Sequence, residues 1–142
     1  MEQIHEDFDL TVQIRPGVVS LQDAAETIST CTLNRECDAI ATFSSLARVI
    51  SDGRRVISCE YEAYLPMAHK VISKIVREAR HKWPSLCACV VVHRTGNVEV
   101  GEIALVIVVA SSKRREALDA VSWVADSLCA QAPIWVKEKS YY

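Results

Sequence analysis

The longest uninterrupted apolar run, IALVIVVA at 103–110, is the feature that most constrains how this chain can fold. A helix that crosses a membrane needs about 20 consecutive apolar residues, so this run is far too short to span one. Its length is that of a β-strand instead. Half of the residues are hydrophobic and 24% are charged, which is the composition of an ordinary globular protein. The run therefore predicts a strand within a globular fold.

Other strands and helices are expected to alternate along the chain. Strands are predicted at 8–14, 38–48, 54–64, 87–93, 97–100 and 103–110. Helices are predicted from Ser20 to residue 30, from Pro66 to Trp83 and over 112–131. Ser51-Asp52-Gly53 has the composition of a turn, and Gly96 and Gly101 separate the later strands. This order predicts a single α+β domain over residues 1–142, with a mainly antiparallel sheet packed by helices.

Two of the helices are predicted from apolar residues at helical spacing. The positions are Met67, Val71, Ile75, Val76 and Ala79 in one helix, and Leu118, Val121, Ala125 and Leu128 in the other. We expect these residues to form the buried faces of their helices. Ser20 is expected to cap the first helix, because its hydroxyl can accept a hydrogen bond from a free backbone N–H of the first turn.

The chain has six cysteines, at 31, 37, 59, 87, 89 and 129. Its N-terminal segment MEQIHEDFDL is acidic and has no apolar signal region, which predicts a cytoplasmic protein with reduced thiols. Cys31 and Cys37 are six residues apart, and Cys87 and Cys89 alternate along a strand, so neither pair has the usual spacing of zinc ligands. We therefore expect buried or incidental thiols and no metal site.

Several common kinds of site have no signature in the chain. There is no G-x-S-x-G around any serine and no glycine-rich phosphate loop, and the net charge of −2 indicates no general attraction to nucleic acid. What remains is a set of basic residues at the ends of predicted elements: Arg48, Arg54, Arg55, His93, Arg94, Lys137 and Lys139. Such groups can converge on an anion, or each can be a solvated surface charge.

Longer motifs indicate a family. The segments are FSSLAR (43–48), EYEAYLPMA (60–68), VVHRTGNVEVGE (91–102), SSKRREALDAV (111–121) and APIWVKE (132–138). In their order and spacing they resemble the large subunit of molybdopterin synthase, from about residue 8 to residue 139. The combination of YEAY-x-x-MA, HR-x-G-x-x-x-x-GE and P-I-W-x-K-E makes the resemblance specific.

This resemblance implies an α/β hammerhead-type domain that forms a homodimer and a heterotetramer with a small ubiquitin-like sulfur carrier. The C-terminal Gly-Gly tail of the carrier ends in a thiocarboxylate and enters a pocket on the large subunit. Sulfur is transferred from the tail to cyclic pyranopterin monophosphate, which gives molybdopterin in the biosynthesis of the molybdenum cofactor. The resemblance implies no metal and no other cofactor for this sulfurtransferase step.

Residue by residue, the resemblance also implies a site. Arg48 matches an arginine that lines the substrate pocket. His93 and Arg94 match a pair that binds substrate anions from the neighbouring protomer. Lys137 and Glu138 match the end of the P-I-W-K-K-E motif, and Lys137 is the candidate catalytic lysine. The alternatives from the residues alone are a strand-end histidine at 93 and a solvated turn residue at 94.

The chain departs from the family pattern at several positions. Family members carry a lysine four residues before the Pro of P-I-W, where this chain has Cys129, and another directly after the Trp, where it has Val136. Ser45 replaces a glycine, and Lys113-Arg114 replaces a His-Arg. If 134–138 is extended, Lys137 points to the opposite face from Val136.

Three hypotheses follow. The chain is a working large subunit in which Lys137 or Lys139 takes over, an impaired relative that serves as a binding or scaffold subunit, or an enzyme that uses Cys129 as a nucleophile. Helical phase puts Cys129 near the edge of the apolar face, which favours a partly buried, inert thiol over a nucleophile.

Overall fold

The computed structural model describes residues 8–32, 37–47 and 50–142. The elements are β1 (Asp9–Pro16), α1 (Leu21–Thr32), β2 (Ala39–Leu46), β3 (Ile50–Ser51), β4 (Arg54–Ala63), α2 (Leu65–Lys82), β5 (Leu86–Glu99), β6 (Ile103–Ser111), α3 (Arg114–Gln131) and β7 (Ile134–Tyr141). Within the described part, no helix is long and apolar enough to cross a membrane. The cytoplasmic location stays a prediction.

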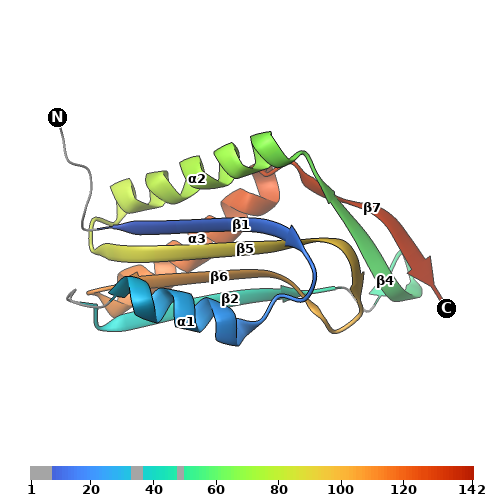
Figure 1. The fold of residues 1–142 in the computed structure, drawn as a ribbon, viewed down its shortest axis with the longest axis horizontal. Coiled ribbons are helices and arrows are strands. Elements are labelled where there is room, and N and C mark those ends of the chain that lie inside the picture. Colours follow the sequence, from blue (N-terminus) through green and yellow to red (C-terminus); the bar gives the residue numbers. More distant parts are fainter. Residues whose placement is uncertain (1–7, 33–36, 48–49) are drawn as a thin grey trace.

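The seven strands form one sheet in the order β2-β6-β5-β4-β3, with β1 added beside β5 and β7 beside β4 (Figure 1). The pair β1–β5 is parallel, and the other strand pairs are antiparallel. The predicted α+β domain with a mainly antiparallel sheet is therefore confirmed.

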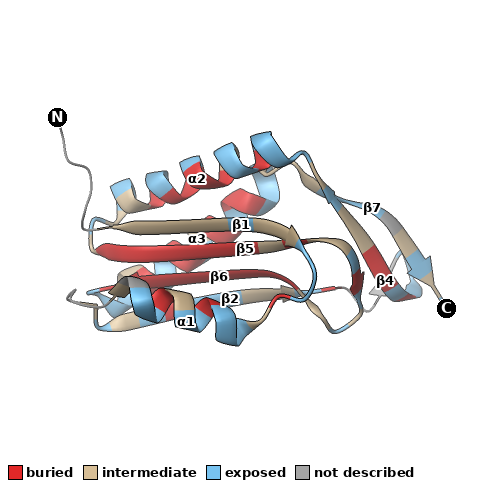
Figure 2. Ribbon diagram, in the orientation of Figure 1, coloured by how far each residue is buried: buried red, intermediate tan, exposed pale blue. Residues whose placement is uncertain are grey.

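The two central strands are buried on both faces, which explains their almost continuous apolar sequences. Helices α2 and α3 cover one face of the sheet, and α1 covers the other (Figure 1). A hydrophobic core lies on each face of the sheet, and alternate residues of β6 pack into one or the other. Ile107 and Val109 face α2 and α3, whereas Val106 and Val108 face α1. The buried colouring of β5 and β6 in Figure 2 follows from this double cover.

Strand β5 is continuous where the sequence predicted two strands. Gly96 does not end the strand; it adopts φ +83° within it. Before Gly96, β5 pairs with β6 and β1, and from Gly96 to Glu99 it pairs with β4. The separate strands predicted at 87–93 and 97–100 are thus one strand, because glycine tolerates the positive φ that a bend in a strand requires.

The distal end of the molecule is a ribbon made of β3, β4 and β7, on the right of Figure 1. Strands β3 and β4 are joined by the predicted turn, in which Asp52 and Gly53 both have positive φ, at 54° and 75°. Two-residue hairpin turns with this geometry favour Asp-Gly.

The helices begin largely as predicted, but their buried faces differ. The Ser20 hydroxyl accepts a hydrogen bond of 3.1 Å from the N–H of Asp23, which confirms the cap. Met67 and Leu118 were expected in the core, yet they are 46% and 50% exposed. Buried alanines beside them, Ala68 and Ala117, take their places. The prediction was wrong there because it followed large side chains, whereas small ones let a helix approach the sheet closely.

The expectation of six free thiols is corrected for one pair. Cys37 and Cys87 form a disulfide across a Cα–Cα distance of 6.5 Å. Spacing along the sequence did not indicate this pair, because the sheet creates it: Ala39 on β2 and Leu86 on β5 both lie opposite Ser111 of β6. Cys59 and Cys89 are free and buried, and Cys129 is free and exposed.

Candidate functional site

A pocket of about 350 Å³ lies where the distal ribbon meets the layer formed by α2 and α3. Residues from α2, α3 and four strands besides β7 line it, together with the segment that enters β7. They are Ser45, Tyr61, Ile72, His93, Ala104, Leu105, Leu128, Cys129, Ala132, Ile134, Trp135 and Val136. Most of this wall is apolar, and its polar groups are few.

The wall at 128–136 is built by the end of α3 and the start of β7. The backbone N–H of Ala132 still bonds to the carbonyl of Leu128, at 3.0 Å, and Pro133 follows. The carbonyl of Pro133 accepts a hydrogen bond from Tyr64 at the start of α2. Strand β7 then pairs with β4, with Val136 opposite Tyr61. These bonds fix the backbone that carries the pocket residues.

Cys129 and Val136, the two positions that differ most from the family pattern, line the same pocket. The expectation that Cys129 is partly buried is wrong, since its side chain is exposed. Leu128 holds the buried position on the last turn of α3, and the next residue is rotated by about 100° around the helix axis. The thiol therefore faces the pocket and solvent.

His93 is the polar residue of the pocket whose electrostatic state is best defined. Its Nδ1 lies 2.9 Å from the backbone carbonyl of Arg94. Because a carbonyl oxygen can only accept a hydrogen bond, Nδ1 carries the hydrogen and is the donor, and in the neutral ring the free lone pair is on Nε2. Burial lowers the pKa of His93, and the hydrogen bond to Arg94 opposes this shift only in part. The ring of Tyr61 meets it edge to face at 5.6 Å. His93 is accordingly a neutral imidazole at pH 7.

Arg94 is buried and does not line the pocket. Its Nη1 donates to Glu102 at 3.0 Å and its Nη2 donates to the carbonyl of Asn97 at 2.8 Å. Glu102 in turn accepts from the N–H of Glu99. Arg94 thus holds together the connection between β5 and β6, and the alternative of a solvated turn residue is excluded.

Lys137 lies outside the pocket wall. Residues 134–138 belong to β7, but the register with β4 shifts between Val136 and Glu138 and skips Lys137, so simple alternation does not decide its direction. Lys137 forms an exposed ion pair of 3.9 Å with Glu62 of β4. Glu138 pairs through its backbone with Glu60, and its side chain lies outside the described part. Arg48 also lies outside the described residues.

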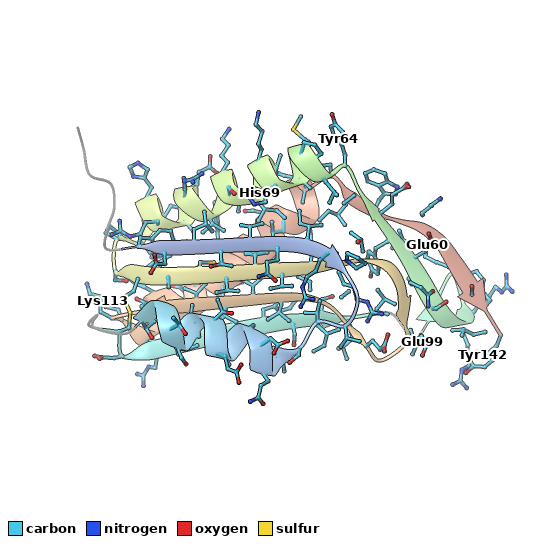
Figure 3. All side chains as sticks on the ribbon, viewed as in Figure 1. Glu60, Tyr64, His69, Glu99, Lys113 and Tyr142 are labelled. Carbon is cyan, nitrogen blue, oxygen red and sulfur yellow. A yellow bond between two sulfur atoms is a disulfide. The ribbon has the colours of Figure 1, made fainter. Side chains whose placement is uncertain are left out.

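Lys139 lies on β7 opposite Cys59 of β4, and two further basic candidates lie over aromatic rings of the distal ribbon. The guanidinium of Arg54 lies 4.0 Å from the ring centre of Tyr141, and that of Arg55 lies 5.5 Å from Tyr142. Lys113 lies at the other end of the molecule from Glu60 and Tyr142 (Figure 3). Among the described residues, the pocket lining contains no lysine and no arginine.

Tyr61, Ile72 and Leu105 line the pocket but were not singled out from the sequence. Tyr61 belongs to the EYEAY motif, and the alternation of β4 places it on one face with Cys59 and Ala63. That motif was the available signal for it. Ile72 and Leu105 carried no signal apart from being apolar. The described residues also contain no group of three or more His, Cys, Asp or Glu placed to hold a metal ion.

Fold and pocket together define a class: an α+β domain with helices on both faces of its sheet and a pocket between one helical layer and a distal β-ribbon. The family described as "MoaE protein" matches residues 15–131. The chain belongs to this family.

Known proteins of the family are similar over most of this chain. The molybdopterin synthase catalytic subunit of Homo sapiens is 42% identical over 115 residues, which are 81% of this chain and 61% of the human protein. The molybdopterin biosynthesis MoaE protein from Burkholderia ambifaria has a TM-score of 0.79 at 29% identity, covering 91% of this chain and 82% of that one.

A third similarity concerns the fold alone. A chain from the complex of subunits 1 and 2 of molybdopterin-converting factor from Helicobacter pylori has a TM-score of 0.74 at 16% identity, covering 92% of this chain and 88% of that one. Against its curated mammalian relatives the chain is shorter, and it spans 55–61% of their length.

Proposed function

We propose that this chain acts as the large, catalytic subunit of a molybdopterin synthase, which transfers sulfur from a thiocarboxylated ubiquitin-like carrier to cyclic pyranopterin monophosphate. The observation that carries the proposal is the pocket of about 350 Å³ whose wall contains the P-I-W segment, in a chain of the MoaE family. The proposed cellular role is molybdenum cofactor biosynthesis.

The lining of the pocket supports a polypeptide tail without side chains as one of its ligands. A Gly-Gly terminus places no side chain against the mostly apolar wall, and Trp135 and Val136 are 45% and 37% exposed there. The similar chain from Helicobacter pylori belongs to a complex of two different subunits. This supports a small carrier subunit as the partner, and the family resemblance adds a second copy of the large subunit, so we propose a homodimer that binds two carrier subunits, giving a heterotetramer.

His93 is proposed to act as a proton acceptor in the pocket. The sulfur of the thiocarboxylate must form a bond to a carbon of the substrate, and water must then attack the acyl carbon of the carrier, so that the acyl C–S bond breaks, the carrier leaves as a carboxylate and the sulfur stays on the substrate. Both steps move protons. A neutral imidazole whose Nδ1–H is held by the carbonyl of Arg94 presents its Nε2 lone pair for that purpose.

Charge for the substrate phosphate is proposed to come from Arg48, because the described pocket lining has no cation of its own. Arg94 is buried outside that lining and is engaged by Glu102, so its proposed role is to orient His93 and the β5–β6 connection, and binding of an anion by Arg94 would require the ion pair with Glu102 to break. A catalytic role for Lys137 and substrate binding by Lys137 and Glu138 are also proposed. A catalytic Lys137 would have to leave Glu62 and turn toward the pocket.

The test is direct. The purified protein is mixed with the thiocarboxylated carrier and cyclic pyranopterin monophosphate, and the dithiolene product is measured. Turnover is expected, and its absence with carrier binding intact would refute the proposal. The alternative of an impaired scaffold subunit has no support among the relatives, which are named as catalytic subunits.

Paired substitutions extend the test to the lysine positions. Cys129→Lys with Val136→Lys would place two cations in the pocket wall, and we expect turnover to rise because charge-assisted hydrogen bonds to an anion contribute about 1.5–3 kcal/mol each. Lys137→Ala is the matched removal. Loss of turnover on Lys137→Ala would support the catalytic role of Lys137, and unchanged turnover would contradict it.

A further inference from the structure

A second cavity lies on the opposite face of the sheet, beneath α1. It has a volume of about 220 Å³ and is bounded by β1, the first two turns of α1 and the middle of β5. None of the residues that line it also line the pocket that contains Cys129. Because α1 covers one face and α2 and α3 the other (Figure 1), the sheet separates the two.

The principal group in this cavity is Arg15. Alternation along β1 sends Val12 and Ile14 toward the core under α2 and α3, so Gln13 and Arg15 point toward α1. The Nε of Arg15 is fully buried and has no hydrogen-bond partner among the described residues. This N–H is closed off from the cavity, so an acceptor placed there would bind to the Nη groups at the tip of the Arg15 side chain, which lines the cavity.

Two more donors face the same space. The Oγ of Ser20 already accepts from the N–H of Asp23, so its own hydroxyl proton is available to a ligand. Gln13 adds a side-chain amide. The back wall is apolar and consists of Val19, Val90 and Val92. Guanidinium, hydroxyl and amide donors beside an aliphatic wall match an oxyanion that carries a short hydrocarbon chain.

The charge of the ligand is limited by Asp23, an exposed carboxylate that lines the same cavity. The Thr27 hydroxyl donates a hydrogen bond of 3.0 Å to the backbone carbonyl of Asp23. It does not bond to the Asp23 carboxylate, so this hydrogen bond does not offset the negative charge of that group. A dianion would meet this carboxylate at a cost, whereas a single negative charge is balanced by Arg15.

We propose that this cavity is a binding site for a small aliphatic monocarboxylate, with Arg15 as the bidentate donor. The planar guanidinium presents its two Nη groups as parallel donors that fit the two oxygens of a carboxylate. The site is independent of the sulfur-transfer pocket, and its occupant contacts α1, β1 and β5.

The experiment is an NMR titration of the full chain with propionate, acetate and inorganic phosphate, which follows the Nε–H signal of Arg15 and the backbone amides of α1. Propionate is expected to bind most tightly because it also contacts the valine wall, and phosphate most weakly. Arg15→Gln should weaken propionate binding by about tenfold or more, the loss expected for a charge-assisted pair. Asp23→Asn should strengthen it.

Arg77→Gln is the matched control, because Arg77 is an exposed arginine on α2, on the other face of the sheet. It should leave propionate binding unchanged. Equal weakening by Arg15→Gln and Arg77→Gln would show a nonspecific charge effect and overturn the proposal. Absence of any shift at the Arg15 Nε–H, or phosphate binding more tightly than propionate, would overturn it as well.

Discussion

Among the free cysteines whose side chains the structure describes, Cys129 is the exposed one, and this exposure determines its reactivity. Burial raises the pKa of Cys89 to about 12, and Cys59 is also buried. We predict that iodoacetamide labels Cys129 in the folded protein at neutral pH, whereas Cys59 and Cys89 react only after unfolding. Peptide mass spectrometry after timed labelling measures this. Equal labelling of all three in the folded state would contradict the exposure of Cys129.

His93 links the pocket to the pH dependence of stability. Its pKa in the folded protein lies below the ordinary value of 6.5, so below that pH the unfolded chain binds a proton more readily than the folded one. The contribution of the neutral His93 side chain to the free energy of unfolding is fully present above about pH 6.5, and it is lost as the pH falls through the pKa of His93 in the folded protein. The free energy of unfolding should decrease there by up to about 1.4 kcal/mol per pH unit.

The matched variant for this prediction is His93→Gln, which removes the titrating group and keeps a side-chain donor. Urea unfolding at several pH values between 5 and 7.5 should show a flatter profile for the variant than for the original protein. His69→Gln, an exposed histidine of α2, serves as the control and should leave the slope unchanged. A slope that His93→Gln does not alter would contradict the lowered pKa.

At the scale of residues, sequence patterns identified part of the candidate site. The P-I-W motif predicted that Cys129 and Val136 belong to the pocket region. Strand alternation predicted that Lys137 points away from Val136, but the register shift at Lys137 means that alternation alone does not decide its direction. Tyr61 and Ile72 were missed because strand pairing and helix packing bring them to the wall from distant segments. The Cys37–Cys87 disulfide was missed for the same reason.

Strand β5 depends on the backbone freedom of Gly96. A Cβ at this position would meet no atom within 4 Å, so substitution costs only the conformational energy of a positive φ, about 1–2 kcal/mol. We predict that Gly96→Ala lowers the free energy of unfolding by this amount, measured by denaturant unfolding. Thr95→Ala, next to Gly96 in the strand, should lower the free energy of unfolding by less. An equal loss for the two variants would contradict the conclusion that the positive φ of Gly96 causes the cost.

Because helices cover β6 on both faces, we predict that substitutions in β6 lower the free energy of unfolding much more than substitutions in its neighbour β2. Ile107 is fully buried, whereas Ile40 on the edge strand is 54% exposed. We predict a loss of about 2–5 kcal/mol for Ile107→Ala and less than about 1 kcal/mol for Ile40→Ala, as measured by urea unfolding. Similar losses for the two variants would mean that the two strands are covered equally.

At the scale of elements, the sequence predicted the existence and order of the long helices and strands because their apolar periodicity is strong. Its errors have specific causes. Gly96 was interpreted as the end of a strand when it is a bend, and the faces of α2 and α3 were assigned from Met67 and Leu118 when alanines make the contacts. Neither the order of the strands in the sheet nor the junction that forms the pocket could be deduced from local pattern.

For the whole molecule, the proposed assembly predicts where the carrier binds. Trp135 is an exposed aromatic residue of the pocket wall, and residues of this kind often dominate binding energy at interfaces. Trp135→Ala should weaken carrier binding by about tenfold or more, measured by calorimetry. Tyr142→Ala, at the far end of the ribbon (Figure 3), should not. Equal affinity of the Trp135→Ala variant and the original protein would place the carrier elsewhere.

The unbroken course of β5 also determines how the pocket can respond to a ligand. His93 stands on this strand before the bend at Gly96, and the ribbon is attached after it. A movement of the ribbon relative to the helical layer would therefore be concentrated at Gly96, the residue of β5 with the greatest backbone freedom. Strand β7, whose strand partner among the described residues is β4, would move together with the ribbon. A ligand that widens the pocket is thus expected to change the backbone of β5 first at Gly96.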